Sequence, residues 1–103
     1  MRRIRYALTF NRDLRELLAY GALRFGKAVA DSKSDDLFAT IVNVLLPRPT
    51  RGKRVRKLKV FKCEIRSAPL VILYDFDDDE IRFHTVVHAR SDIPNTDLSE
   101  IAW

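Results

Sequence analysis

Two histidines near the end of the sequence are the side chains best suited to acid–base chemistry near neutral pH. His84 and His88 lie four residues apart in residues 81–88, where apolar and polar residues alternate as in a β-strand. In one extended strand the two rings share a face but lie about 13 Å apart, at about 3.3 Å per residue. They therefore do not form an acid–base pair, and we interpret them as structural residues. His88, close to Arg90, is the remaining candidate for proton transfer.

The single cysteine, Cys63, offers neither a disulfide nor a metal centre. It alternates with Phe61 and Ile65, which predicts a small buried hydrophobic side chain rather than a nucleophile. One Cys and two His without adjacent carboxylates do not make a ligand set, and the three glycines form no phosphate-binding loop. The sequence predicts no metal site and no cofactor.

The charges are separated along the chain, which has a net charge of +5. Between residues 48 and 66, Glu64 is the only acid, and the cations are Arg48, Arg51, Lys53, Arg54, Arg56, Lys57, Lys59, Lys62 and Arg66. Five of the six residues 75–80 are acidic. We interpret the acidic run as a solvated turn. The basic run enters a strand, where side chains are held in order, and this favours a surface for an acidic partner.

Hydrophobic spacing predicts the elements that position these residues. Residues 2–10 alternate as a first strand. A first helix is expected to be capped by Asn11 or Asp13, to end near Gly26, and to be followed by a connection of residues 27–33. The apolar stripe of this first helix comprises Leu14, Leu17, Leu18, Gly21 and Phe25. A second helix is expected after the connection, with an apolar stripe of Leu37, Phe38, Ile41, Val44 and Leu45.

Three strands are expected after Pro47, which ends the second helix. A basic loop, residues 48–54, leads into a strand at residues 55–66. The continuous apolar run at residues 70–74 predicts a central strand covered on both faces, and residues 81–88 form the last strand. This order predicts an α+β fold: an N-terminal strand, an antiparallel helix hairpin, and a three-stranded antiparallel meander.

The whole chain, residues 1–103, is expected to form one domain in which residues 93–103 are a C-terminal tail. Hydrophobic residues make up 47% of the sequence, which suffices for one core. The sequence shows no signal peptide and no run long enough to span a bilayer, so we expect a cytoplasmic protein without a membrane partner.

Three motifs resemble, in order and in position, those of the RelE/ParE toxin superfamily, and ParE most closely. The DLRELLAYGALRFG segment at residues 13–26 is similar to the first-helix pattern of ParE toxins. The stretch from Ile41 to Gly52 resembles the end of their second helix, and VVHARSD at residues 86–92 resembles their late strand. The resemblance covers about residues 4–93. It implies a toxin of a type II toxin–antitoxin system, held inactive in a complex with its cognate antitoxin.

The resemblance also implies two alternative targets. RelE toxins cut mRNA on the ribosome, whereas ParE toxins inhibit DNA gyrase without cleaving RNA. A ribonuclease would use Lys62, Arg66, His88 and Arg90, three of which fall on basic positions of the RelE site. However, Glu64 and Val71 stand where RelE has a lysine and an arginine, and the tail has no tyrosine. A carboxylate where a phosphate should bind opposes RNA cleavage, so we favour an inhibitor that acts by binding and has no catalytic residue.

On the ParE interpretation, antitoxin and target contact the exposed basic segment and the tail. The candidate residues are Arg51, Lys53, Arg54, Arg56, Lys57, Lys59, Arg90 and Trp103. An acidic, unstructured antitoxin segment would fold onto this surface and into grooves between helices and sheet. Three alternatives stay open: a ribosome-dependent mRNA endoribonuclease, a non-catalytic nucleic-acid-binding module, and a toxin-like protein that has lost its activity.

Overall fold

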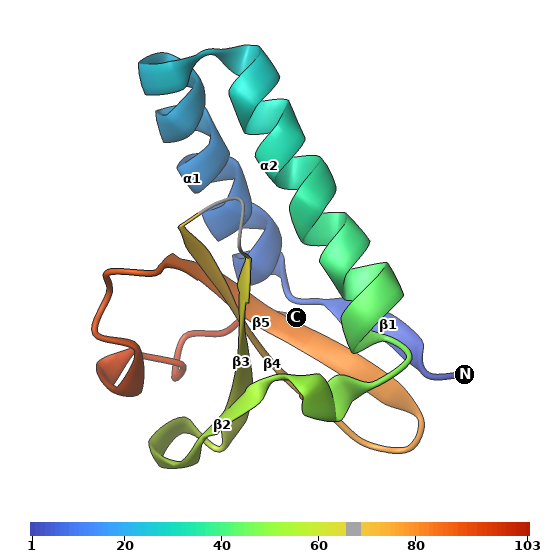
Figure 1. Ribbon diagram of the computed structural model, residues 1–103. Helices are drawn as coiled ribbons and strands as arrows, with labels where there is room; N and C mark the ends of the chain where they lie inside the picture. The colour runs from blue at the N-terminus through green and yellow to red at the C-terminus, as the bar shows by residue number, and fades with distance from the viewer. Residues whose placement is uncertain (66–68) are drawn as a thin grey trace.

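The computed structural model describes residues 1–65 and 69–103, and shows a five-stranded sheet with a helix hairpin on one face (Figure 1). In spatial order the strands are β1 (Arg3–Tyr6), β5 (Glu80–His88), β4 (Leu70–Phe76), β3 (Val60–Ile65) and β2 (Lys53–Val55). The β1–β5 pair is parallel and the other pairs are antiparallel. The predicted α+β fold is confirmed. The single strand expected at residues 55–66 is wrong in its first part, because Val55 ends the short edge strand β2, a 3-10 turn follows, and β3 begins only at Val60.

The first helix, α1 (Leu8–Phe25), begins earlier than its sequence suggests. Asn11 and Asp13 lie inside the helix, so the expectation that one of them caps it is wrong. The Ala102 carbonyl accepts hydrogen bonds from the backbone amides of Leu8 and Thr9, at 2.6 and 3.4 Å. A distant segment therefore satisfies the first-turn donors that a local side chain would otherwise cap.

The second helix, α2 (Lys27–Thr40), starts directly after Gly26, so the expected connection at residues 27–33 is wrong. Gly26 has a φ of 93°, a conformation that costs glycine little, and this lets one residue reverse the chain between the helices. The helix ends in a π-helical turn, η1 (Ile41–Leu45), just before Pro47 as expected. The closed end of the hairpin extends beyond the sheet (Figure 1), which leaves Phe25 59% exposed rather than buried in the predicted stripe.

The main core lies between the helix hairpin and the sheet. Its fully buried side chains include Phe10, Leu37, Ile41, Tyr74 and Phe83. Every residue of β4 from Leu70 to Tyr74 is buried, which confirms the predicted central strand. Phe38 and Val44, expected on the apolar stripe of the second helix, are instead more than one-third exposed.

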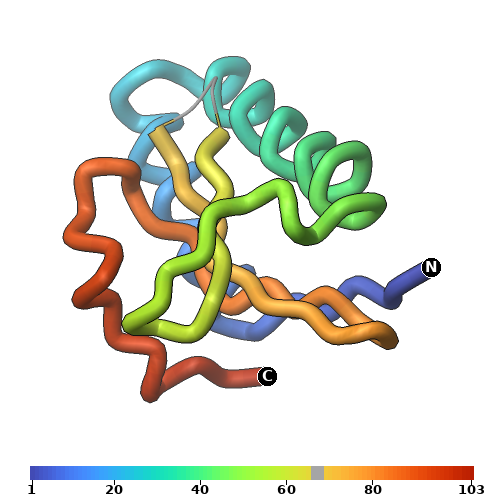
Figure 2. Tube along the Cα trace, turned by 60° about the horizontal axis from the view of Figure 1, so that its bottom comes forward, coloured from blue at the N-terminus to red at the C-terminus, as the bar shows by residue number. Residues whose placement is uncertain are grey.

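The other face of the sheet is covered by the C-terminal segment, residues 93–103, which runs past the β2–β3 end of the molecule (Figure 2). Ile93, in the short helix η4 (Ile93–Asn95), is buried in a second cluster. That cluster comprises Val55, Val60, Val71, Leu73 and Ile93, with Leu58, Val87 and Leu98 packed against it. The predicted tail is thus an integral layer of the fold. Within the described chain, no helix has the length and apolarity needed to cross a bilayer.

Candidate functional site

Hydrogen bonds of one buried side chain, Tyr74, attach the basic segment (residues 48–59) to the central strand β4. Two short 3-10 helices, η2 (Pro49–Arg51) and η3 (Arg56–Leu58), flank β2. The Tyr74 hydroxyl donates to the Pro49 carbonyl at 2.6 Å and accepts from the Gly52 amide at 3.1 Å. Burial raises the pKa of Tyr74 to about 12, so the phenol stays protonated and keeps donating at physiological pH. Tyr74 thereby fixes the start of the basic segment against the sheet.

Gly52 lies where the chain leaves no room for a side chain. A Cβ at this position would lie 2.7 Å from the Lys62 carbonyl oxygen on β3 and would also meet the Tyr74 hydroxyl. Lys59, at the end of η3, has a φ of 57° and turns the chain into β3. The path of the basic segment is therefore set by a close backbone approach at one end and by a left-handed turn at the other.

We define the basic surface as the six exposed cations Arg51, Lys53, Arg54, Arg56, Lys57 and Lys59. None of them forms a salt bridge with an acid in the described residues. Lys57 donates to the Asn95 side chain, and the Arg54 guanidinium lies over the Phe61 ring at 5.6 Å. Lys53 faces Lys62 directly across the β2–β3 pair, an arrangement in which like charges repel. The predicted cationic surface is present, and its charge is not neutralised from within.

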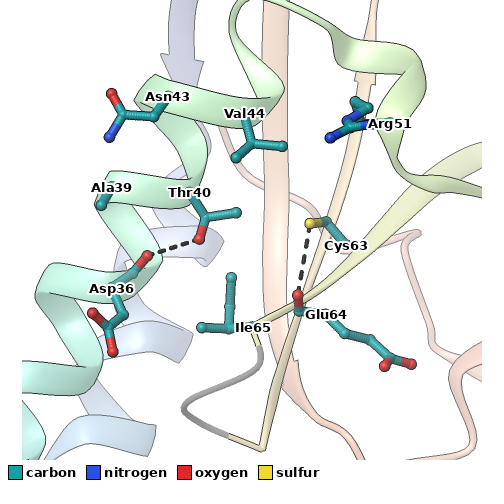
Figure 3. Close-up of a pocket in the computed structure, with 9 residues that line it drawn as sticks. All are labelled: Asp36, Ala39, Thr40, Asn43, Val44, Arg51, Cys63, Glu64 and Ile65. Carbon is teal, nitrogen blue, oxygen red and sulfur yellow. Dashed lines mark hydrogen bonds between the residues drawn. The ribbon is translucent and has the colours of Figure 1, made fainter.

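A groove of about 590 Å³ separates α2 and η1 from β3 (Figure 3). Val44 and Thr40 project into it from the helical side, and Cys63 and Ile65 from the strand, with Arg51 at its rim. β2 pairs only with the first three residues of β3, so in the described chain no strand pairs with the outer edge from Cys63 to Ile65. The groove thus combines an apolar wall with an unoccupied strand edge.

Next to this groove lies a second depression of about 290 Å³, which we call the cationic hollow. It is lined by Arg51, Gly52, Lys53, Lys62, Cys63 and Glu64. Cys63 is half-buried rather than fully buried as expected, and burial together with Glu64 raises the pKa of its thiol. A raised pKa reduces the thiolate fraction, which agrees with the prediction that Cys63 is not a nucleophile.

The structure separates the residues of the ribonuclease alternative. Lys62 lies on the face of the sheet covered by the C-terminal segment, because it pairs with Leu73 of the second cluster. His88 pairs with Leu70 on the opposite face, where it lines a small pocket against the helices. Arg90 is exposed in the turn after β5, and its amide donates to His88 Nδ1 at 3.1 Å. Arg66 lies outside the described residues.

His84 and His88 do not share a face as expected for a regular strand. A register shift opposite Leu73 and Tyr74 places an extra residue in β5. His84 consequently packs edge-on against Trp103, at 5.0 Å between ring centres, on the face away from the helices. Its Nε2 lies 3.3 Å from Asp75 Oδ1. Trp103 is 39% exposed and also carries the Arg5 guanidinium over its ring at 4.9 Å.

Three of the five acids in residues 75–80 bind one arginine of β5, Arg82. Arg82 donates to Asp75 at 2.7 Å, to Asp77 at 2.8 Å and to Glu80 at 2.9 Å. The hydrogen bond from Arg82, with two backbone amides, lowers the pKa of Asp77 to about 2. The run is therefore a turn as predicted, but it is held by ion pairs and not only by solvent.

The comparison with known proteins now identifies the family. The family model described as "ParE toxin of type II toxin-antitoxin system, parDE" matches residues 4–93. The chain belongs to the ParE toxin family. A solved structure titled "Chromosomal ParDE TA system from P. aeruginosa" has the same fold, with a TM-score of 0.71 and 14% sequence identity. The match covers 85% of this chain and 96% of that chain. No curated protein matches the sequence significantly.

Three features of this ParE-family site were not predicted from the sequence: the anchoring phenol of Tyr74, the close approach at Gly52, and the open edge of β3. A signal for the first was present, because Tyr74 ends a fully apolar run and a buried tyrosine hydroxyl needs a hydrogen-bond partner. The open edge had no such signal, since it depends on how few residues of β2 pair with β3.

Proposed function

We propose that this chain is a ParE-type toxin that inhibits DNA gyrase by binding it and that a cognate antitoxin neutralises it in the cytoplasm. The observation that carries this proposal is the filled second face of the sheet. Val71, at a position where RelE toxins have an arginine, is fully buried with Leu73 and Ile93. An apolar cluster stands where a ribonuclease would hold the scissile phosphate, which supports action by binding.

The position of the ribonuclease candidates supports the same conclusion. Proton transfer and charge stabilisation at one phosphate require groups within hydrogen-bond reach of the same atoms. Lys62 and His88 lie on opposite faces of the sheet, and Glu64 lines the hollow beside Lys62. No single substrate phosphate reaches both candidates in this arrangement.

The groove between α2 and β3 is the proposed antitoxin site. An extended segment that pairs with the outer edge of Cys63–Ile65 would gain backbone hydrogen bonds, and apolar side chains of the segment would contact Val44 and Ile65. Arg51 at the rim favours an acidic residue at that end of the segment, whereas Asp36 and Glu64, which also line the groove, favour neutral or basic residues beside them. Such a segment would also cover part of the basic surface, which explains how one partner can block access to a target.

Expression with and without the antitoxin tests the proposal, followed by two assays on purified toxin. We expect growth arrest relieved by the antitoxin, loss of supercoiling by gyrase, and no cleavage of mRNA on ribosomes. Arg51→Glu should weaken antitoxin binding by at least about tenfold, because it reverses the charge at the rim. Lys27→Glu, at the far end of the hairpin, serves as the matched control. Ribosome-dependent cleavage that disappears in Lys62→Ala or His88→Ala would overturn the proposal.

The contribution of the C-terminal segment to target binding needs single substitutions. Deleting residues 93–103 would uncover Val71 and Leu73 and remove the Ala102 carbonyl from α1, so a loss of activity would report unfolding. Arg90→Gln, just before this segment, changes an exposed side chain, whereas Trp103→Ala also removes the ring that packs against His84 and Arg5. If this region binds gyrase, we expect both variants to inhibit supercoiling less, with the urea midpoint near that of the parent protein for Arg90→Gln and modestly lower for Trp103→Ala.

A further inference from the structure

We infer that the basic surface and the cationic hollow bind the phosphate backbone of duplex nucleic acid directly, for which duplex DNA is the probe. This inference goes beyond inhibition of gyrase, since it assigns a contact between the toxin itself and nucleic acid. It stands on the geometry of residues 51–62 and holds whether or not gyrase is the target. It also assigns a role to cations that the groove does not use, because the groove involves only Arg51 at its rim.

The first argument is the unrelieved repulsion inside the hollow. Lys53 and Lys62 are cross-strand partners, and the Arg51 side chain lines the same depression. Like charges directly opposite each other destabilise a strand pair, and no acid in the described residues forms a salt bridge with any of the three. An anion bound among these three cations removes that repulsion, so the hollow favours an anionic ligand.

The second argument is that the hollow is already formed in the free protein. Gly52 lies in close contact with the Lys62 carbonyl, and the Tyr74 hydroxyl holds Gly52 through its amide. The backbone that carries Arg51 and Lys53 is therefore fixed before any ligand arrives. A fixed cluster of cations binds an anion with a smaller ordering cost than cations on a mobile loop.

The third argument is the extent of the charge. Beyond the hollow, four more exposed cations follow along the chain: Arg54 on β2, Arg56 and Lys57 on η3, and Lys59 at the end of η3. Arg54 pairs with Phe61 and therefore lies on the opposite face of the edge strand from Lys53. The hollow suits one phosphate, whereas cations on both sides of an edge strand suit successive phosphates of a polymer. A protein partner would need apolar anchors for affinity, but every exposed residue from Lys53 to Lys59 is basic.

The fourth argument selects duplex over single-stranded nucleic acid. Binding of single strands commonly depends on aromatic rings on which bases stack. In the described residues, the aromatic rings near this surface are those of Tyr74, which is fully buried, and Phe61, whose ring lies under Arg54 and packs against Tyr74 and Phe76. The surface therefore offers contacts to phosphates and none to unstacked bases.

Glu64 is the one unfavourable group, because its carboxylate lines the hollow beside Lys62. It limits the affinity for phosphate without cancelling the three cations. Removing this negative charge should therefore have the opposite effect to removing a lysine: Glu64→Gln should bind duplex DNA more tightly than the parent protein.

The test is fluorescence anisotropy of a labelled random-sequence duplex with purified toxin, without gyrase, over a range of salt concentrations. The logarithm of the affinity should fall with the logarithm of salt, with a slope of about −0.9 per phosphate neutralised. Lys53→Gln should make the slope shallower by about one and weaken binding by about eightfold at about 0.1 M salt. Lys53→Arg should restore most of both quantities. Lys27→Gln, the same change at the far end of the hairpin, should leave both unchanged.

Several results would overturn the inference. They are equal effects of Lys53→Gln and Lys27→Gln, a slope near zero, or a single-stranded nucleic acid or an acidic polypeptide that binds as tightly as duplex DNA. Because gyrase is absent from the assay, failure here leaves the supercoiling result intact, and failure of gyrase inhibition leaves this result intact. The urea midpoint of each variant shows whether it remains folded. The increase in DNA affinity expected for Glu64→Gln is a further check, because unfolding cannot produce it.

Discussion

The acidic turn and the basic surface are both runs of like charge, but they differ in whether the fold provides partners of opposite charge. Arg82 ties Asp75, Asp77 and Glu80 into one cluster. The cations from Arg51 to Lys59 have no acidic partner in the described part of the chain. The acidic run is thus a structural element because the fold supplies a counterion, whereas the basic run keeps exposed charge that we propose binds a ligand.

Strand pairing is the physical cause of the difference. Asp75 and Arg82 are register partners on β4 and β5, so the sheet itself brings opposite charges together. β2 lies at the edge of the sheet and has only β3 beside it, where Lys62 is the partner of Lys53. The edge strand therefore keeps cations that no acid of the described residues pairs with.

The largest expected effect comes from removing the cation at the centre of the acidic turn. Arg82→Met leaves three carboxylates close together without their shared donor, and its side chain is only 21% exposed. We expect a loss of about 2.5 kcal/mol in the free energy of unfolding, measured by urea titration. Arg12→Met, which removes an exposed pair with Asp13, should cost about 0.5 kcal/mol or less. Equal losses would contradict the distinction between the two regions.

The hydrogen bonds of Tyr74 to the basic segment predict a smaller loss of stability and, in addition, weaker DNA binding when its hydroxyl is removed. Tyr74→Phe leaves the Pro49 carbonyl and the Gly52 amide without their partner, at a cost of about 1.5 kcal/mol. We also expect weaker binding of duplex DNA, because Arg51 and Lys53 lose their fixed backbone. Tyr20→Phe is the matched control, since its exposed hydroxyl accepts from Arg24 and from no other group in the described residues. Unchanged DNA binding in Tyr74→Phe would show that the hollow needs no anchor.

The acidic turn also predicts a pH dependence. The pKa of Asp77 is lowered from 3.8 to about 2 in the folded chain, so its ion pair stabilises the fold above pH 3.8. This stabilisation is lost as the pH falls through the folded pKa. Urea midpoints should therefore decline between about pH 4 and pH 2, and less so in Asp77→Asn. Asp78→Asn, with no hydrogen bond in the described residues, should follow the parent curve; a parallel decline of Asp77→Asn would refute the assignment.

The smallest expected effect has the opposite sign. Lys53→Gln removes one of two facing lysines, so the free energy of unfolding should rise by about 0.3 kcal/mol. The measurement is again a urea titration, at low salt, where exposed charges interact most strongly. A destabilised variant would mean that Lys53 has a partner within the fold and would weaken the comparison between the two regions.

Local spacing was sufficient to predict several elements of this protein. The apolar run from Leu70 to Tyr74 becomes the central strand because only full burial suits five successive apolar side chains. Gly26 ends the first helix, and the segments after Pro47 form the antiparallel strands. The start of α1 was missed because its capping acceptor, the Ala102 carbonyl, comes from the other end of the chain.

By itself the sequence determined the order of the helices and of four of the five strands, the separation of charge and the resemblance to ParE, since these depend on residue type and spacing. Only the tertiary structure decided which charges are neutralised, which face carries each histidine, and that residues 93–103 form a layer of the core. Those outcomes depend on register, on one bulge and on contacts between distant segments. Such contacts form only when the strands pair into the sheet, so no local sequence pattern predicts them.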